Sequence, residues 1–175
     1  MNLTFGELAE TSIGPLSFIA GDEGLRQASF MRLKQLKTGE EIQDTGPSLK
    51  GMEMIGTLLI EMNEYLFGIR MDFSVEVDWH VLQGFGREVL QEVCRIPYGD
   101  VLTYGDVARR LGKPKSARAV GRALSGNPIP IVIPCHRVIG ADKRLVGYTA
   151  PEGLKTKVFL LQLEGHQVQG DRVVG

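Results

Sequence analysis

Residues 127–138 restrict the local backbone more than any other part of this sequence. They read NPIPIVIPCHRV, with prolines at 128, 130 and 134. Proline fixes its own φ and biases the preceding residue toward extended geometry, so the chain before Cys135 has little freedom. The segment therefore predicts a rigid, apolar loop that presents a cysteine and a histidine, Cys135 and His136.

Cys135 can act as a nucleophile only as its thiolate. Burial beside the apolar residues 131–133 would raise the pKa of this thiol, so a nearby group must oppose the effect. His136 and Arg137 are the candidates, although neighbours on an extended strand point to opposite faces, and a direct pair with His136 needs a turn or a bridging water. A buried structural cysteine beside a satisfied histidine is the alternative for the pair taken alone.

Length and composition favour a soluble globular protein. The 175 residues, 43% hydrophobic and 23% charged, suffice for one sizeable core or two small domains. The longest apolar run is far shorter than the roughly 20 residues that span a bilayer. The acidic residues Glu7 and Glu10 occupy the region where a signal peptide has basic residues. The two cysteines, Cys94 and Cys135, are too few for a disulfide scaffold. We expect a cytoplasmic protein without membrane attachment.

Charge is divided unevenly along the chain. Residues 1–78 contain 6 Lys/Arg and 13 Asp/Glu (net −7), whereas residues 79–175 contain 14 and 8 (net +6). The break coincides with a change of pattern near 77–81, so we predict two domains, 1–78 and 79–175. Basic residues crowd around one predicted turn of the second domain, at Arg109, Arg110, Lys113, Lys115, Arg118 and Arg122. They favour phosphate binding, with a solvated charged face as the alternative.

The first domain is expected to be a mixed α+β scaffold. Residues 13–20 and 27–30 are strand candidates, 52–67 has helical apolar spacing, and 71–77 alternates apolar and polar residues as a strand does. Its acidic residues Asp22, Glu23, Glu53 and Asp72 lack paired spacing, so we expect a solvated face and no metal site.

The second domain is expected to be helical up to the cysteine loop. Apolar residues at 85, 89, 90 and 93 share one side of a predicted helix. The IPYG segment at 96–99 ends this helix. Thr103 is the expected cap of a helix 104–111 that Gly112 ends, and Ser116 the expected cap of a helix reaching Leu124. Two short helices joined by a turn with Gly and Pro predict a helix-turn-helix.

The second of these helices carries small residues between two arginines. Ala117, Ala119, Gly121 and Ala123 alternate with Arg118 and Arg122. A small-residue surface allows close backbone approach, which suits a minor groove and little sequence preference. A close helix–helix contact is the alternative explanation.

Several motifs together resemble the O6-alkylguanine-DNA alkyltransferase family. The PCHRV segment after NP and an Ile/Val run resembles the family's active-site segment. In the family's order the chain also has IPYGDVLTYG at 96–105, ARAVG at 117–121, GY at 147–148 and LLQLEG at 160–165. The resemblance covers residues 85 to 165. It implies a ribonuclease-H-like first domain and a second domain that binds and repairs DNA.

The activity implied by the resemblance is direct reversal of DNA alkylation. A methyl or larger alkyl group would pass from O6 of a flipped-out guanine, with O4 of thymine as a second candidate, to Cys135 in one self-inactivating turnover. The residues implied in catalysis are Cys135, His136, Glu164 and Asn127. In these roles His136 relays the thiol proton through water, Glu164 orients His136, and Asn127 ties the recognition helix to the cysteine loop.

Further residues are implied in DNA binding and in the substrate pocket. Those for DNA binding and base flipping are Tyr104, Arg118, Ser116, Ala117, Ala119, Gly121 and Arg122, with Arg118 as the finger that enters the base stack. Those for the pocket are Tyr104, Val138, Tyr148 and Thr149, and the Val138 carbonyl would help to read the guanine amino group. The implied partner is alkylated double-stranded DNA, contacted by a monomer in the minor groove, in a nucleoid or nucleus. No cofactor is expected, and no metal, because residues 1–78 contain no Cys or His.

Two departures from the family pattern and three rival functions stay open. FGREVL at 85–90 replaces FQxxVW, and YTAPEG at 148–153 replaces a shorter glycine-rich loop, which affects substrate size. A non-catalytic alkyltransferase-like DNA binder lacks the cysteine that this chain has. A helix-turn-helix regulator would leave the thiol unmodified, and a cysteine hydrolase would leave the basic helix pair unexplained.

Overall fold

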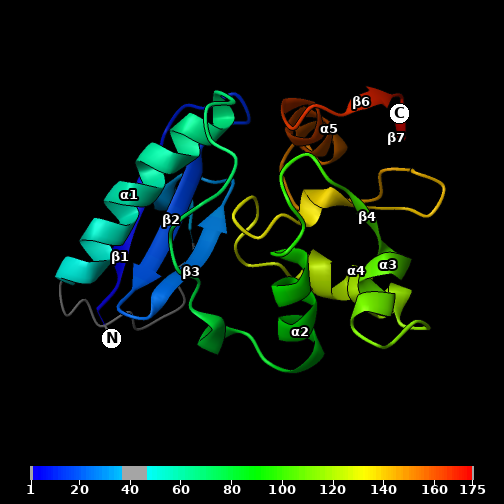
Figure 1. Cartoon of the computed structure of the whole chain (residues 1–175). Helices are drawn as coiled ribbons and strands as arrows, with labels where there is room; N and C mark the ends of the chain where they lie inside the picture. Colours follow the sequence, from blue (N-terminus) through cyan, green and yellow to red (C-terminus); the bar gives the residue numbers. More distant parts are fainter. Residues whose placement is uncertain (1, 37–46, 175) are drawn as a thin grey trace. The chain divides into compact units, whose positions relative to one another are not determined.

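The computed structural model describes residues 2–36 and 47–174 and divides the chain into two compact units, Met1–Val81 and Leu82–Gly175 (Figure 1). Each unit contains its own helices and strands. The predicted α+β class is confirmed. Among the described residues no helix has both the length and the apolarity needed to cross a bilayer.

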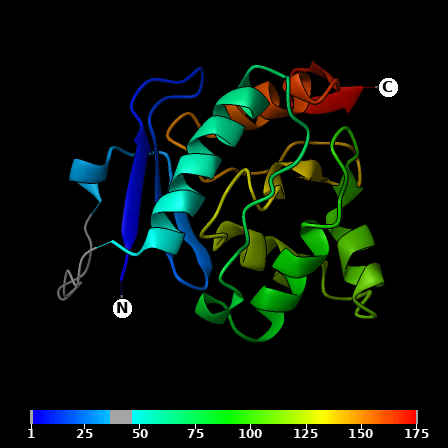
Figure 2. The ribbon, with the colours of Figure 1, turned by 60° about the vertical axis from the view of Figure 1, so that its left-hand side comes forward.

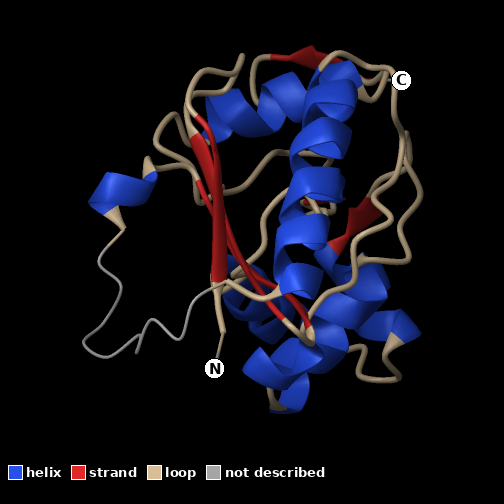
Figure 3. Ribbon diagram, turned by 90° about the vertical axis from the view of Figure 1, so that its left-hand side faces the viewer, coloured by secondary structure: helices blue, strands red, loops and turns tan. Residues whose placement is uncertain are grey.

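The first unit is a three-stranded antiparallel sheet with one long helix against it. The strands are β1 (Thr4–Leu8), β2 (Leu16–Gly21) and β3 (Gly24–Ser29), in the order β1-β2-β3. The helix is α1 (Leu49–Leu66), which runs alongside the strands in Figures 2 and 3. The six residues of β2 are all buried, as its central position requires. Two single 3-10 turns complete the unit, η1 (Leu33–Gln35) and η2 (Trp79–Val81).

Some predictions for the first unit fail. The expected strand at 71–77 is wrong, since this stretch is irregular and only Val77 forms an isolated bridge, with Leu25. Its polar groups bond to α1 instead: Ser74 N and Oγ donate to the buried Glu61 carboxylate at 3.0 and 2.6 Å. The strands predicted at 13–20 and 27–30 are displaced to β2 and β3, and β1 was not expected. The ribonuclease-H-like likeness stays a prediction.

The second unit is mostly helical. Its elements are α2 (Gly84–Val93), β4 (Leu102–Thr103), α3 (Tyr104–Arg110), α4 (Ala117–Ser125), η3 (Cys135–Arg137), β5 (Val138–Ile139), α5 (Leu154–Leu163), β6 (Gln167–Gln169) and β7 (Arg172–Val174). Helices α2, α3 and α4 pack on one another, and short parallel pairing of β4 with β5 sets the start of α3 beside the end of the cysteine loop. This pairing brings the helix pair and the loop into one site.

The helix pair is capped as expected at its first helix only. The Thr103 side chain accepts from Asp106 N at 3.1 Å, the Asp106 carboxylate accepts from Thr103 N at 2.9 Å, and Gly112 ends α3 with φ +69°. At α4 the predicted capping bond from Ser116 is absent. Its backbone has ψ 15°, outside the extended geometry that points a cap side chain at the helix N–H groups.

A C-terminal hairpin is hydrogen-bonded to residues 143–145, which directly precede the segment 146–149. Strands β6 and β7 pair antiparallel, Leu145 N donates to Asp171 O at 2.7 Å, and Val173 N donates to Lys143 O at 3.0 Å. Leu145 and Val173 pack into an apolar cluster with Ile139 and Leu161. Residues 146–149 are thus attached to a fixed base.

Candidate active site

The cysteine loop is a series of turns and not an extended strand. Ile133 N donates to Ile129 O at 2.9 Å, and Cys135 N donates to Ile133 O at 2.8 Å across Pro134, whose φ −81° and ψ 61° define an inverse γ-turn. Ile131 has φ +76°, a left-handed conformation that is strained for a β-branched residue. The prolines therefore rigidify the loop as predicted, but they do so by bending it.

Asn127 connects the end of α4 to this loop. Its Nδ2 donates to Ile133 O at 2.9 Å, and its Oδ1 accepts from Ile129 N at 3.0 Å. Its side chain also lowers the pKa of the Cys135 thiol. The Cys135 sulfur is consequently held at a fixed distance from α4.

Cys135 is buried, and burial raises the pKa of its thiol. Two neighbours act in the opposite direction: the hydrogen bond from Asn127 and the positive charge of Lys157 both lower this pKa. The resting side chain is a thiol, and the groups that stabilise the thiolate are already in place.

Behind the cysteine, His136, Arg137 and Glu164 form a buried polar network. Their residues are 0%, 7% and 5% exposed. Glu164 Oε1 lies 2.9 Å from His136 Nε2, while the Glu164 carboxylate accepts from Arg137 Nε at 2.9 Å and from Arg137 Nη2 at 2.8 Å. Arg137 is thus the counter-ion that makes a buried Glu164 tolerable.

This network fixes the state of the imidazole. Burial lowers the pKa of His136, and the Glu164 carboxylate only partly offsets that effect, so the ring is neutral near pH 7. A carboxylate can only accept, hence the ring hydrogen is on Nε2 and the lone pair on Nδ1. The ring is in the tautomer of a proton acceptor.

The IPYG segment closes the same network from a third part of the chain. Ile96 O accepts from Arg137 Nη1 at 2.7 Å, and Tyr98 OH donates to Leu163 O at 2.7 Å. Gly99 has φ +81°, a conformation that favours glycine, and this turn points its N–H at Glu164 Oε2, 3.4 Å away. Three motifs far apart in sequence therefore meet around one carboxylate.

In front of Cys135 is a cavity of about 600 Å³, large enough for a nucleobase. Its lining residues are Tyr104, Ala117, Arg118, Gly121, Arg122, Leu124, Ser125, Cys135, Val146, Gly147, Tyr148, Thr149 and Lys157. Tyr104 begins α3, and its hydroxyl donates to Val146 O at 3.3 Å, across the cavity. The cavity lies between the helix pair and the segment 146–149.

The structure divides the predicted site residues into three sets. The cavity is lined by Cys135, Tyr104, Ala117, Arg118, Gly121, Arg122, Tyr148 and Thr149. His136, Glu164 and Asn127 lie behind the cysteine and support it. Ser116, Ala119 and Val138 are outside the lining, and the Val138 carbonyl, expected to read guanine, accepts from Lys157 Nζ at 2.7 Å.

Sequence reasoning missed Lys157. This residue of α5 is 1% exposed, and its ammonium donates to Val138 O at 2.7 Å and to Val146 O at 3.4 Å. Burial lowers its pKa to about 8, while the charge of Cys135 acts to raise it. One signal was available, because Lys157 precedes the apolar Leu160 and Leu161 by three and four residues and so shares their helix face.

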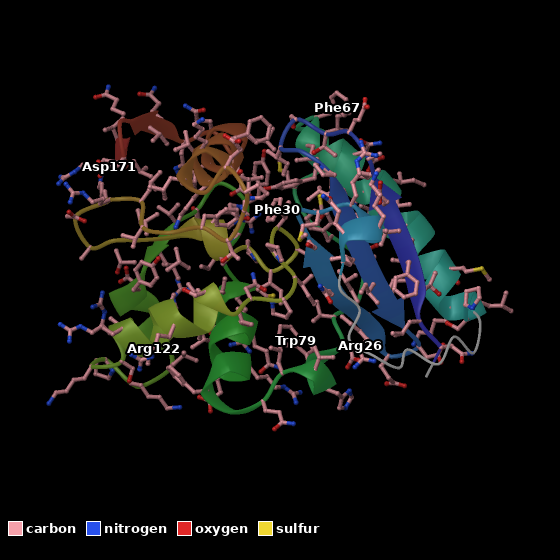
Figure 4. The ribbon with its side chains drawn as sticks, turned by 180° about the vertical axis from the view of Figure 1, so that it is seen from behind. Arg26, Phe30, Phe67, Trp79, Arg122 and Asp171 are labelled. Atoms are coloured by element: carbon pink, nitrogen blue, oxygen red, sulfur yellow. The ribbon has the colours of Figure 1, made fainter. Side chains whose placement is uncertain are left out.

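The basic cluster is smaller than the sequence indicated. Arg109 pairs with Asp106, Arg110 with Glu92 and Lys113 with Glu88. Within the part of the chain that the structure describes, Lys115, Arg118 and Arg122 have no carboxylate within ion-pair distance. Arg118 and Arg122 are exposed one turn apart on α4, where Figure 4 labels Arg122. The positive face available to a phosphate is thus on α4.

Comparisons with known proteins agree on one family. Residues 84–166 match the family model described as "6-O-methylguanine DNA methyltransferase, DNA binding domain". A methylated-DNA–protein-cysteine methyltransferase of Methanosarcina acetivorans is 37% identical over 156 residues, 89% of this chain and 95% of that protein. The namesake from Mycobacterium leprae is 45% identical over 108 residues, 62% of this chain and 64% of that protein.

A solved structure extends the likeness to the whole fold. The Mycobacterium tuberculosis OGT in complex with DNA is 35% identical, has a TM-score of 0.72, and the match covers 92% of each chain. This neighbour is similar over both units and not over the cysteine loop alone.

Proposed function

This chain belongs to the family of methylated-DNA–protein-cysteine methyltransferases, which act in direct-reversal DNA repair, and we propose that Cys135 is the residue that takes up the alkyl group. One observation carries the assignment: Cys135 is the only thiol that lines the 600 Å³ cavity, and a polar network supports it from behind. Cys94, the other cysteine, is not among the lining residues.

The reaction is an in-line displacement at the alkyl carbon. The bond from Cys135 Sγ to that carbon forms as the carbon–O6 bond breaks, and the electron pair passes to guanine O6. The departing guanine gains a proton at N1, and the thiol loses one, so protons balance. The thioether has no leaving group of comparable quality, and each molecule therefore acts once.

His136 receives the thiol proton, through a bridging water, in the tautomer that Glu164 sets. Positioned general bases contribute on the order of 10²–10⁴-fold to such steps. Glu164 is a positioning residue in this scheme, since it touches His136 and not the substrate. Arg137 is the counter-ion of Glu164, and the Asn127 amide and the Lys157 ammonium stabilise the thiolate.

The DNA partner is alkylated duplex, approached through α4 in the minor groove. Extrusion of the base is required because Cys135 is buried at a cavity lined by residues of α3, α4 and 146–149, where O6 of a stacked guanine cannot reach its sulfur. Arg118 fills the vacated stack, Arg122 adds a phosphate contact, and Tyr104 donates to the flipped guanine. The small Ala117 and Gly121 let the backbone approach closely, with little sequence preference.

The remaining assignments complete the proposal. The protein acts as a monomer without cofactor or metal, in the cytoplasm at the nucleoid of a prokaryote or in a eukaryotic nucleus. Thr149 and Tyr148 close the cavity over the lesion, and O4-alkylthymine is a second substrate. The described residues hold no cluster of three potential metal ligands.

The test is transfer of a labelled methyl group from an O6-methylguanine duplex to the wild type and to Cys135→Ala. We expect transfer by the wild type, no transfer by the variant, and equal affinity of both for the duplex. Transfer by Cys135→Ala would contradict the assignment of the acceptor, and DNA binding without transfer by the wild type would indicate a non-catalytic binder.

A further inference from the structure

The cavity that faces Cys135 has an unusual charge balance. Three of its thirteen lining residues are cationic, Arg118, Arg122 and Lys157, and none is Asp or Glu. A methyl substituent gains nothing from such charge. The arrangement is therefore informative about which other alkyl groups the cavity accepts.

Lys157 contributes charge that acts on Cys135 and on any occupant of the cavity. The side chain is 1% exposed, so its ammonium cannot reach a phosphate on the DNA surface. Of its three N–H donors, two point at Val138 O and Val146 O. The third donor is available to an acceptor inside the cavity, where Lys157 and Cys135 are both lining residues.

The two carbonyls do not neutralise this charge. Buried cations are normally paired with an anion, and the buried carboxylate of the site, Glu164, already binds Arg137 and His136. Burial lowers the pKa of Lys157, which is the response of an ammonium that lacks full compensation. An anionic group in the cavity would supply what is missing.

Arg122 adds a second positive charge at the cavity rim. It lines the cavity from α4, is exposed, and has no ion-pair partner among the described residues. Arg118 lies one turn earlier, but its proposed place is in the base stack. Lys157 at the base of the cavity, which also stabilises the Cys135 thiolate, and Arg122 at its rim, which also contacts a phosphate, are thus the two cations that can meet a charged substituent of the lesion.

We propose that this cavity selects guanines whose O6 substituent carries a negative charge, such as a carboxymethyl group, with Lys157 and Arg122 as the residues that set this preference. The inference rests on the proposed function of the same site. In the transition state a carboxylate on the transferred carbon would repel the Cys135 thiolate, and the positive charge of Lys157, which lines the same cavity, offsets that repulsion.

The step is the one proposed for methyl transfer. The sulfur–carbon bond forms as the carbon–O6 bond breaks, guanine takes the electron pair and a proton at N1, and the protein retains S-carboxymethylcysteine. No additional reactant is required.

The test compares two lesions that differ in charge and hardly in size. Duplexes carrying O6-carboxymethylguanine or its neutral amide, O6-carbamoylmethylguanine, are mixed with excess protein, and single-turnover rates are measured by intact mass. The quantity compared is the ratio of the acid rate to the amide rate, which cancels general losses of activity. O6-methylguanine duplex serves as a third substrate for every variant.

We expect the wild type to transfer the acid at least as fast as the amide, and Lys157→Met to lower the ratio roughly tenfold, a typical size for loss of a close charge pair in a desolvated site. Arg122→Gln lowers it severalfold and covers the case that Lys157→Met does not fold. The matched control is Lys155→Met, on the same helix with a side chain 85% exposed, which leaves the ratio unchanged.

An unchanged ratio in both Lys157→Met and Arg122→Gln would overturn the inference and leave methyl transfer intact, since the cations would then serve only the thiolate and the DNA. A wild type that transfers the amide more than tenfold faster than the acid would also overturn it. Failure of the wild type on O6-methylguanine would instead refute the proposed function.

Discussion

Replacing Glu164 with glutamine tests the buried network behind the nucleophile. The Glu164 side chain is 0% exposed and accepts hydrogen bonds from Arg137 Nε, Arg137 Nη2 and His136 Nε2 at 2.8–2.9 Å. Glutamine keeps the shape but removes the charge, and it turns an NH₂ group toward these donors. Arg137, with a side chain 8% exposed, would be left as a buried cation without a counter-ion.

Breaking a buried pair on one side costs about 3–5 kcal/mol. Domains of this size have stabilities of about 5–15 kcal/mol, so Glu164→Gln should still fold at 25 °C but unfold at clearly lower urea. Its methyl-transfer rate should fall as well, by up to about 10²-fold, because the imidazole loses the acceptor that sets its tautomer.

The assay is urea unfolding followed by far-UV circular dichroism at pH 7, with single-turnover methyl transfer on the same samples. Trp79 belongs to the first unit, so its fluorescence separately reports whether that unit is affected. The matched control is Glu88→Gln, an exposed acid whose partner Lys113 is also exposed, for which we expect at most about 1 kcal/mol. If Glu164→Gln is no more destabilising than this control, the argument from buried charge is refuted.

Three further predictions follow from the second unit. Arg118→Ala and Arg122→Ala should each weaken duplex binding and reduce the slope of log affinity against log salt concentration by about 1. Arg109→Ala, which removes a residue paired with Asp106, should change this slope little. Equal slopes for all three variants would contradict the α4 interface. Thr103→Ala should cost roughly 1 kcal/mol in urea unfolding, through loss of the α3 cap, and an unchanged midpoint would argue against the cap. Lys157 has a pKa of about 8 in the folded protein, against 10.5 for an ordinary lysine, so the unfolded chain binds more protons between these pH values. The free energy of unfolding of the wild type should therefore rise from pH 8 to 10.5 by up to about 3 kcal/mol relative to that of Lys157→Met. A constant difference between the two proteins over this pH range would contradict burial of this charge.

The features predictable from sequence are those set by neighbouring residues. Thr103 and Asp106 form a cap within one turn, and Gly112 ends the same helix, so both could be inferred from spacing. The rigidity of residues 127–138 follows from proline geometry alone. The α+β class and the α1 helix follow from periodicity over many residues.

The features that sequence reasoning missed depend on contacts between distant residues. The strand expected at 71–77 had a suitable pattern, but Glu61 on α1 binds Ser74, and only Val77 reaches the edge of β3, where it bridges Leu25. The positive field around the turn after α3 was overestimated, because Glu88 and Glu92 on α2 neutralise part of it. The burial of Lys157 could not be predicted from composition, because it results from the packing of α5 against the cysteine loop.

The proposed function depends on Cys135 as a stoichiometric acceptor, and peptide mapping by mass spectrometry tests this most directly. The protein is incubated with excess O6-methylguanine duplex, its intact mass is measured, and the modified peptide is sequenced. We predict a gain of one methyl group per molecule, located on Cys135, with no further gain however long the incubation. More than one guanine repaired per protein molecule, or a methyl group found on any other residue, would contradict the account.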